Sequence, residues 1–284
     1  MVYRYFLLFL SLFVVYEMCG QTKRAVIIGI GQQEDNNWGK INGDKDVPFI
    51  LRTLCDAGYQ KGNIVTLVNE QATKKNIVMA FGDLAKRSQK KDIVYIHFSG
   101  HGQRVTDING DEKDGWDEAW IPYDACREYC DRDRGEKHLI DDEIYKFLKL
   151  IKKKIGKDGK MLVTVDACHS GGSTFGIKTY SYGGHITIRG VPDNFVIPSK
   201  RTIKKNKMPE DWLTLSACKS HQYNQEMQNP RVGILTYALY SLARKGNIRM
   251  EDIENFIKKN KGPYPQTPVL IGETGKYSIS DVLK

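Results

Sequence analysis

The stretch KMLVTVDACHSGG, Lys160 to Gly172, begins as an apolar, β-branched run and ends in a cysteine, a histidine, a serine and two glycines. Residues 160–167 predict a buried strand, and the two glycines predict a turn soon after it. Cys168 therefore stands at the end of a strand. It can be interpreted as a nucleophile, as a metal ligand, or as a small residue that fills the strand end.

This strand belongs to a regular alternation of strands and helices. Further apolar runs predict strands at 24–30, 63–68, 92–98, 211–217 and 267–272. Apolar residues at helical spacing predict helices at 47–58, 77–85, 141–154, 233–246 and 250–259. Apolar strands separated by helices are typical of a mainly parallel sheet covered on both faces. The sequence thus predicts an α/β domain with a central six-stranded sheet flanked by helices.

Two long segments interrupt the alternation. Residues 102–138 are acidic in the middle and rich in turn residues, and residues 172–209 are rich in Gly, Ser, Thr and Lys with little periodicity. Long irregular segments in a compact domain are most often functional loops or linkers. We expect the first to be an irregular insertion and the second to be a flexible linker.

The amino-terminal residues differ from the rest of the chain. The apolar run from Tyr5 to Tyr16 is too short to cross a bilayer but suits the core of a signal peptide. We therefore expect residues 1–20 to be a signal peptide and residues 21–284 a single exported domain, which is periplasmic, bound to the cell envelope or secreted. Acylation at Cys19 is the alternative. No second membrane span follows.

Charge and cysteine count narrow the class of partner. The formal net charge of the 284-residue chain is +9, but the basic residues lie in scattered runs without interleaved aromatics, so we do not expect nucleic-acid binding. Five cysteines remain after residue 20, and an odd number leaves at least one free thiol. Cys126 and Cys130 either form a disulfide, the alternative we favour, or stay reduced.

Reactive residues follow two strands that are expected to be neighbours. His97 and His101 lie in YIHFSGHG, and Cys168 and His169 lie in VTVDACHSGG. A single crossover helix between the two strands predicts that they are parallel neighbours, so both motifs reach the same sheet edge. His169 points away from its neighbour Cys168, and we expect His97 to pack inside its strand.

His101 therefore remains as the base that would activate Cys168. Backbone N–H groups at Gly102 and Cys168 would stabilise the oxyanion. The structural alternative, a buried cysteine beside ordinary turn histidines, suits an isolated cysteine better than this pair of motifs. A zinc site is disfavoured because metal-ligand pairs usually have hairpin or helical spacing.

The motifs HFSGHG and DACHSG resemble those of caspase-like cysteine peptidases, most closely the metacaspases and their bacterial relatives. The resemblance extends from about Arg24 to the carboxyl terminus. It implies a caspase-like sandwich and peptide hydrolysis through an acyl-enzyme, with Cys168 as nucleophile, His101 as general acid and base, and Gly102 and Cys168 as oxyanion donors.

The acids near these motifs predict which bond is cut. Asp166 lies two residues before the nucleophile, and a carboxylate there favours a cationic P1 side chain. The resemblance adds Asp46, with Asp44 as the alternative register, Ser99 and Glu226 to a substrate-binding site. From its position alone, Asp46 is equally well interpreted as a helix N-cap. We expect cleavage after Arg or Lys.

The sequence DINGDEKDGWDE, residues 107–118, has the density of oxygen ligands that calcium requires, although its glycines do not match an EF-hand. The resemblance implies an activating calcium site in which Asp114 and Asp117 of this loop join Asp141 and Asp142. The alternative is a solvated acidic loop followed by a helix cap. The chemistry itself requires no cofactor.

Together these features predict a monomeric cysteine endopeptidase that acts on peptides or proteins with a basic P1 residue. Linker residues 172–209 are candidates for self-cleavage, because proteolysis favours exposed loops. The basic residues of this linker include Arg189, Lys200, Arg201, Lys204, Lys205 and Lys207. The alternative functions are a catalytically silent caspase-fold module that binds peptides and an adhesive calcium-binding protein.

Overall fold

The computed structural model describes residues 21–168, 187–191, 193–198, 211–272 and 275–284. The predicted signal peptide, His169 and most of the predicted linker lie outside these residues. Arg189 is the only one of the named basic linker residues that lies inside them.

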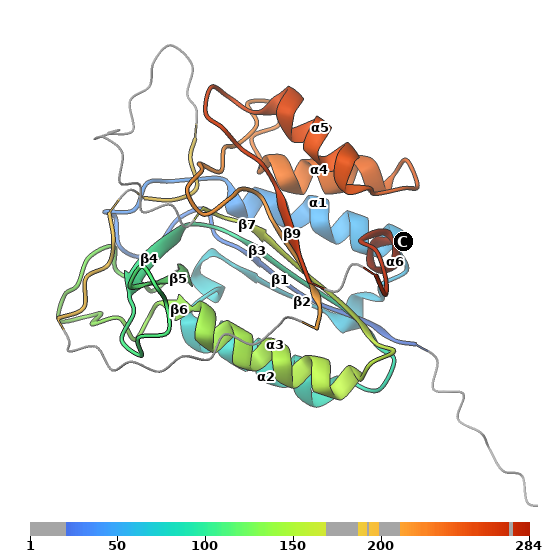
Figure 1. The fold of residues 1–284 in the computed structure, drawn as a ribbon, viewed down its shortest axis with the longest axis horizontal. Coiled ribbons are helices and arrows are strands. Elements are labelled where there is room, and N and C mark those ends of the chain that lie inside the picture. The colour runs from blue at the N-terminus through green and yellow to red at the C-terminus, as the bar shows by residue number, and fades with distance from the viewer. Residues whose placement is uncertain (1–20, 169–186, 192, 199–210, 273–274) are drawn as a thin grey trace, which may run out of the picture.

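A six-stranded sheet forms the centre of the domain (Figure 1). In spatial order its strands are β2 (Ile64–Val68), β1 (Lys23–Gly29), β3 (Ile93–Ser99), β7 (Lys160–Asp166), β8 (Leu213–Ser216) and β9 (Val269–Ile271). The first five strands are parallel, and β9 pairs antiparallel with β8. The predicted six-stranded, mainly parallel sheet is confirmed.

Helices cover both faces of this sheet, which explains why its central strands are apolar throughout. One face carries α1 (Gly43–Asp56), α4 (Ile234–Ala243) and α5 (Met250–Asn260). The other face carries α2 (Lys74–Arg87) and α3 (Asp141–Ile155) (Figure 1). Alternate residues of β3 therefore enter two separate cores: Tyr95 packs on the first face, and Ile96 and Phe98 pack on the second.

The expectation that residues 102–138 are irregular is wrong. A small antiparallel sheet runs in the order β4 (Gly102–Thr106), β5 (Trp116–Trp120) and β6 (Leu139–Ile140). Alternate residues of β5 are buried, but its acidic residues and the turn-rich flanks hide the pattern in the sequence. Phe195 joins this sheet through hydrogen bonds to Arg104 and Thr106, so the chain is held against the small sheet at this residue.

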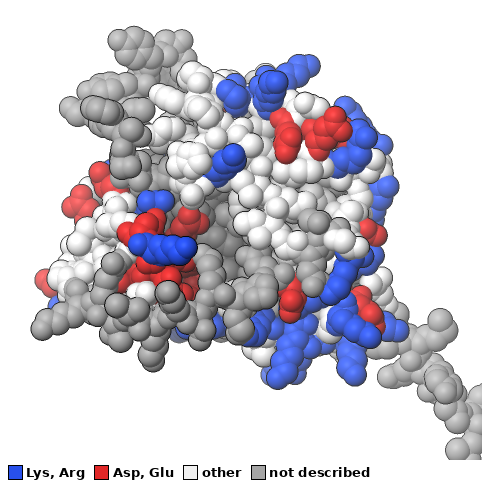
Figure 2. All heavy atoms as spheres, in the orientation of Figure 1, with Lys and Arg blue, Asp and Glu red and all other residues white. Residues whose placement is uncertain are grey.

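Short helical segments complete the described chain. These are a 3₁₀ turn at Lys61–Asn63, another at Asn69–Gln71, and α6 (Ser280–Leu283). Across the part of the chain that the structure describes, none of the helices combines the length and the apolar character needed to cross a bilayer. Figure 2 shows basic side chains in several separate groups, and acidic side chains gathered over the small sheet.

The register of two strands places the reactive motifs together. β3 and β7 are parallel neighbours, and Ser99 at the end of β3 pairs with Asp166 at the end of β7. His101 and Cys168 each follow two residues later, so both lie at the same sheet edge. The predicted convergence of the two motifs is confirmed.

Candidate active site

His101 is buried between Trp38 and the backbone of Gly39. Its Nε2 atom lies 2.6 Å from the Gly39 carbonyl oxygen, and its ring centroid lies 5.1 Å from that of Trp38. A carbonyl oxygen only accepts hydrogen bonds, so neutral His101 carries its proton on Nε2. Among the described residues Nδ1 has no hydrogen-bond partner. This nitrogen therefore keeps a lone pair that can accept a proton.

Trp38 is held in place by the turn that follows β5. Its indole Nε1 donates to the Ala125 carbonyl oxygen at 3.0 Å, and its ring packs in a third core with Val105, Ala119 and Phe195. Neither Trp38 nor Gly39 was predicted from the sequence, because one acts through ring stacking and the other through a backbone oxygen. No residue pattern marks either role.

Cys168 follows β7 and is fully buried. Its thiol donates to the Gln222 carbonyl oxygen at 2.8 Å. Gly190 lies directly against it: a Cβ atom on Gly190 would come within 2.7 Å of the Cys168 carbonyl oxygen and 3.3 Å of Sγ. Only glycine fits there without displacement, so the peptide between Arg189 and Gly190 lies next to the thiol.

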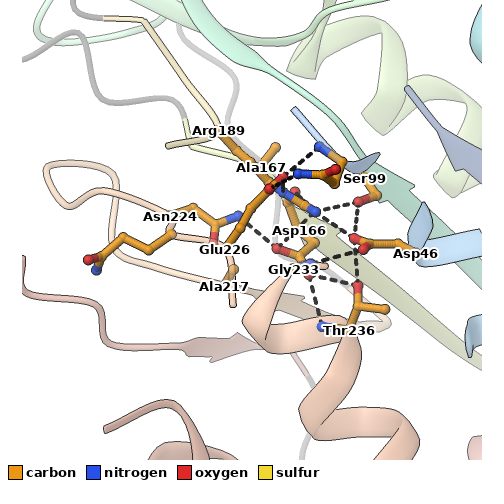
Figure 3. A network of polar contacts seen from close by, with 12 residues as sticks. Asp46, Ser99, Asp166, Ala167, Arg189, Ala217, Asn224, Glu226, Gly233 and Thr236 are labelled. Atoms are coloured by element: carbon orange, nitrogen blue, oxygen red, sulfur yellow. Dashed lines mark hydrogen bonds and ion pairs between the residues drawn. The ribbon is translucent and has the colours of Figure 1, made fainter. Parts of the chain in front are cut away.

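Arg189 is surrounded by Asp46, Ser99, Asp166 and Glu226, which we call the acidic site (Figure 3). Its Nη1 atom lies 2.6 Å from Asp46 Oδ2 and 3.4 Å from Asp166 Oδ1. Its Nε atom lies 3.0 Å from Glu226 Oε1. All four charged side chains are buried. The four residues predicted for substrate binding thus converge on one guanidinium.

The start of α4 holds two of these carboxylates in place. The Gly233 N–H donates to Asp46 at 2.9 Å, and the Thr236 N–H and hydroxyl donate to Asp166 at 2.8 and 2.7 Å. Asn224 adds a third hydrogen bond to Asp166 at 2.7 Å. Exposed N–H groups and the helix dipole make a helix amino terminus favourable for negative charge. The start of α4 therefore helps to hold the acidic site in place. No sequence motif indicated this role.

The charges of the acidic site are strongly coupled. Burial raises the pKa of Asp46 against the opposing effect of the Arg189 charge. Burial alone would also raise the pKa of Asp166, but the Arg189 charge and the hydrogen bonds from Asn224 and Thr236 lower it below its ordinary value. The surrounding carboxylates raise the pKa of Arg189 despite its burial. Arg189 therefore stays cationic, and Asp166 keeps its negative charge beside it.

The backbone around Arg189 lies as an added strand. Ile188 forms an antiparallel bridge with Gln225. The Arg189 N–H donates to Asn224 O at 2.9 Å, and the Glu226 N–H donates to Thr187 O at 3.0 Å. Main-chain pairing of this kind is a common way to bind an extended peptide, whose side chains are then read by separate pockets.

Two interpretations of individual residues are resolved by the structure. Asp46 is not the N-cap of α1, because the helix begins at Gly43 with Asn42 as its cap and Asp46 faces inward. Its contacts also select Asp46 over the alternative register at Asp44.

His97 packs inside β3 as predicted, with Nδ1 2.7 Å from the Thr164 hydroxyl. Gly102 begins β4, and its oxyanion role stays a prediction.

An acidic cluster lies in the loop between β4 and β5. Carboxylate oxygens of Asp107, Asp111 and Asp117 lie within 4.8 Å of one another. Burial, and then the charges of Asp141, Asp107 and Asp142, raise the pKa of Asp117 to about 8. Asp114 instead forms an ion pair with Arg104 at 3.6 Å and is half exposed. Of the four predicted ligands, only Asp117 therefore belongs to this cluster. Asp141 and Asp142 lie outside it but are near enough for their charges to act on Asp117.

The two cysteines of the turn after β5 are thiols in the structure. The Cys130 and Cys126 Sγ atoms lie 3.2 Å apart. Asp133 fixes both residues: its carboxylate accepts from the Cys126 N–H, and its backbone pairs with that of Cys130. The pair is thus held close without the disulfide that the sequence favoured.

Comparison with protein families points to one family. The family model described as "Metacaspase, peptidase C14 domain" matches residues 23–174. Metacaspase-1A of Aspergillus niger is 27% identical over 273 residues, which cover 81% of this chain and 64% of the relative. Metacaspase-1B of Aspergillus terreus is 32% identical over 164 residues, which cover 55% of this chain and 40% of the relative. The chain therefore spans less than two thirds of the length of these relatives.

Solved structures agree with this assignment at the level of fold. Protein GSU0716 from Geobacter sulfurreducens superimposes with a TM-score of 0.62 at 23% identity, covering 93% of this chain and 97% of that one. Caspase-1 from Spodoptera frugiperda superimposes with a TM-score of 0.56 at 12% identity, covering 89% of each chain. The predicted caspase-like fold is confirmed.

The buried histidines predict how stability responds to acid. Burial lowers the pKa of His97 and of His101 from 6.5 to about 4. Between these values the two histidines bind protons in the unfolded chain but not in the folded protein, so their contribution to the free energy of unfolding should fall as the pH is lowered through this window. Asp117, whose pKa is raised, contributes in the opposite direction, so the histidine contribution is read from the difference between wild type and variant. Each histidine contributes a slope of up to about 1.4 kcal/mol per pH unit.

Urea unfolding at several pH values checks this expectation. His97→Gln should reduce the pH slope, because glutamine does not titrate. His221→Gln, at an exposed histidine, is the matched control and should leave the slope unchanged. Equal slopes for all three proteins would contradict the expectation.

Proposed function

Since the chain belongs to the metacaspase family of cysteine-type endopeptidases, we propose that it hydrolyses peptide bonds after arginine or lysine, with Cys168 as nucleophile and His101 as general base. One observation carries the proposal. A guanidinium of the chain itself, that of Arg189, lies among three buried carboxylates, and the peptide that follows it lies against Cys168.

The geometry supports a two-step acyl transfer. Cys168 attacks the carbonyl carbon after the bound basic residue while Nδ1 of His101 accepts the thiol proton. Backbone N–H groups of Gly102 and Cys168 would stabilise the oxyanion. His101 then passes the proton to the leaving amine. Water attacks the resulting thioester with His101 as base, which releases the acid product and restores the thiol.

Charge decides which side chain enters the acidic site. An arginine or lysine places its cation among Asp46, Asp166 and Glu226 in a buried environment where charge-assisted hydrogen bonds are strong. An aspartate would add a fourth carboxylate to three that are already buried, which is strongly unfavourable. The substrate class is therefore peptides with a cationic P1 residue.

Fluorogenic peptides that end in Arg, Lys or Asp test this specificity. Wild type should cleave the Arg and Lys peptides, and Cys168→Ala should cleave none. Asp46→Asn should lower kcat/KM for the Arg peptide at least about 30-fold, because removing one partner of a buried charge pair costs about 2–5 kcal/mol. Asp44→Asn, in the same helical turn, is the matched control and should cleave as wild type does.

Other outcomes separate the alternatives. Binding of Arg peptides without hydrolysis would support the catalytically silent peptide-binding module. Cleavage after Asp, or equal loss of activity in Asp44→Asn and Asp46→Asn, would contradict the assignment of the acidic site.

Self-cleavage after Arg189 is part of the same proposal. Residues 187–189 pair with residues 224–226 as a bound peptide would, and the Arg189–Gly190 peptide lies beside the Cys168 thiol. These contacts support Arg189 as the P1 residue of a self-cleavage site. While it stays there it also blocks the acidic site against other substrates.

Peptide mapping of freshly purified protein tests self-cleavage. Wild type should release a new amino terminus at Gly190, whereas Cys168→Ala and Arg189→Ala should remain uncut at this bond. Arg231→Ala, which removes an exposed arginine, should be cut as wild type is. A cut at Gly190 in Cys168→Ala would assign the cleavage to a contaminating peptidase.

Calcium is the proposed activator, and the acidic cluster fits it. Oδ1 of Asp111 and Oδ1 of Asp117 are buried and lack a hydrogen-bond partner among the described residues. Calcium takes six to eight oxygen ligands, and Asp107, Asp111 and Asp117, with Asp141 and Asp142 nearby, would supply them. The ion would offset the repulsion within the cluster and so order the loop beside β4.

Thermal unfolding with and without calcium tests this site. At about 100 times its Kd, a bound ion adds roughly 2.7 kcal/mol of stability, which would raise the Tm by about 5–10 °C. Asp117→Asn should abolish this rise, and Asp114→Asn should keep it, because Asp114 pairs with Arg104. A rise of equal size in both variants would place calcium elsewhere.

A further inference from the structure

A second thiol, Cys218, lies beside the nucleophile and has no part in peptide hydrolysis. It follows β8 as Cys168 follows β7, and the two strands are parallel neighbours with Val165 paired to Ser216. Both thiols donate to one acceptor, the Gln222 carbonyl oxygen, at 2.8 Å for Cys168 and 3.4 Å for Cys218. Because both sulfur atoms lie within hydrogen-bonding distance of one oxygen atom, they lie close together at this sheet edge.

The two thiols also contact each other. A hydrogen bond to the Cys168 side chain, together with burial, raises the pKa of Cys218 well above its ordinary value. Cys218 is therefore a protonated, inert thiol in the resting enzyme. It does not compete with Cys168 for substrate. It is nevertheless close enough to react with an oxidised Cys168 sulfur.

We propose that Cys218 is a resolving thiol that captures oxidised Cys168 as a reversible Cys168–Cys218 disulfide. A hydroperoxide is the oxidant. The Cys168 thiolate attacks one peroxide oxygen, which gives a sulfenic acid on Cys168 and releases hydroxide or alkoxide. The Cys218 sulfur then attacks the sulfenic sulfur. An S–S bond forms, the S–O bond breaks, and the Cys218 proton leaves with the hydroxyl group as water.

Formation of the disulfide protects Cys168, the proposed nucleophile, from irreversible oxidation. Oxidation of a sulfenic acid to sulfinic acid is irreversible for most proteins, whereas a disulfide is restored by thiols. In the structure Gly190 lies against the Cys168 thiol. A reactive Cys168 thiol is open to substrate and to small oxidants alike. Cys218 is the only thiol among the described residues that shares its hydrogen-bond acceptor.

The chain contains a second pair of thiols that serves as an internal control for oxidation. Cys126 and Cys130 lie 3.2 Å apart in the turn after β5, and a disulfide between them reports that the oxidant has acted. Cys55 is exposed and would form links between molecules, so the experiment is done in a Cys55→Ser background. This background leaves both thiol pairs intact.

Thiol mapping by mass spectrometry tests the proposal. Wild type is titrated with hydrogen peroxide until the Cys126–Cys130 disulfide has formed, and each variant receives the same dose. The remaining thiols are alkylated, and the protein is digested without reductant. We expect the Cys168 peptide joined to the Cys218 peptide, and recovery of most of the peptidase activity after dithiothreitol. In Cys218→Ser, which keeps a hydrogen-bond donor to Gln222, Cys168 should end as sulfinic acid and activity should not recover.

Cys126→Ser is the matched control and should still form the Cys168–Cys218 link. The proposal is overturned if the Cys126–Cys130 link forms while Cys168 stays free, or if Cys168 reaches sulfinic acid equally in wild type and Cys218→Ser. The inference rests on the proposed function only in taking Cys168 as the reactive thiol. Because mapping needs no peptide hydrolysis, a Cys168–Cys218 link in a protein that cleaves no peptide would refute the peptidase and leave the inference standing.

Discussion

The Arg189 guanidinium, buried with three carboxylates, is the constraint on which the rest of the site depends. Charges removed from water are tolerated only when they are paired and their hydrogen bonds are satisfied. Here the first turn of α1, the ends of β3 and β7, the segment after β8 and the start of α4 each supply a partner. Correct assembly of the sheet and of one helix layer is thus required before the cluster can form.

The residues proposed for catalysis and those proposed for substrate recognition lie at the same sheet edge. The register of β3 and β7 pairs Ser99 with Asp166. His101 and Cys168 each follow two residues later in the chain, so they lie at the same end of the two strands. The small sheet adds a second support, because Ala125 holds Trp38, which stacks on His101. Its other contact is with Phe195, which follows Gly190 in the chain. The small sheet therefore supports both the ring of His101, the proposed base, and the segment that contains Phe195.

The sequence predicted the central fold well because parallel strands buried on both faces leave a clear apolar signal. It also predicted His101, Cys168, Asp46, Ser99, Asp166 and Glu226 as one site, since strand order and a family resemblance together placed them. It did not predict the small sheet, because acidic and turn residues conceal the two-residue alternation of β5. The Gly39 carbonyl and the N–H groups of α4 were also missed, since backbone atoms leave no side-chain signature.

The acidic site is built from both sides of the linker. Asp46, Ser99 and Asp166 precede residue 172, whereas Asn224, Glu226, Gly233 and Thr236 follow residue 209. Neither half of the chain contains all the residues that form the site. A break between the halves would leave two fragments joined only by noncovalent contacts, chiefly the β7–β8 ladder and the packing of α1 against α4. The recognition site would then exist only while the fragments stay associated, so substrate selectivity would depend on protein concentration, as in an obligate two-subunit enzyme.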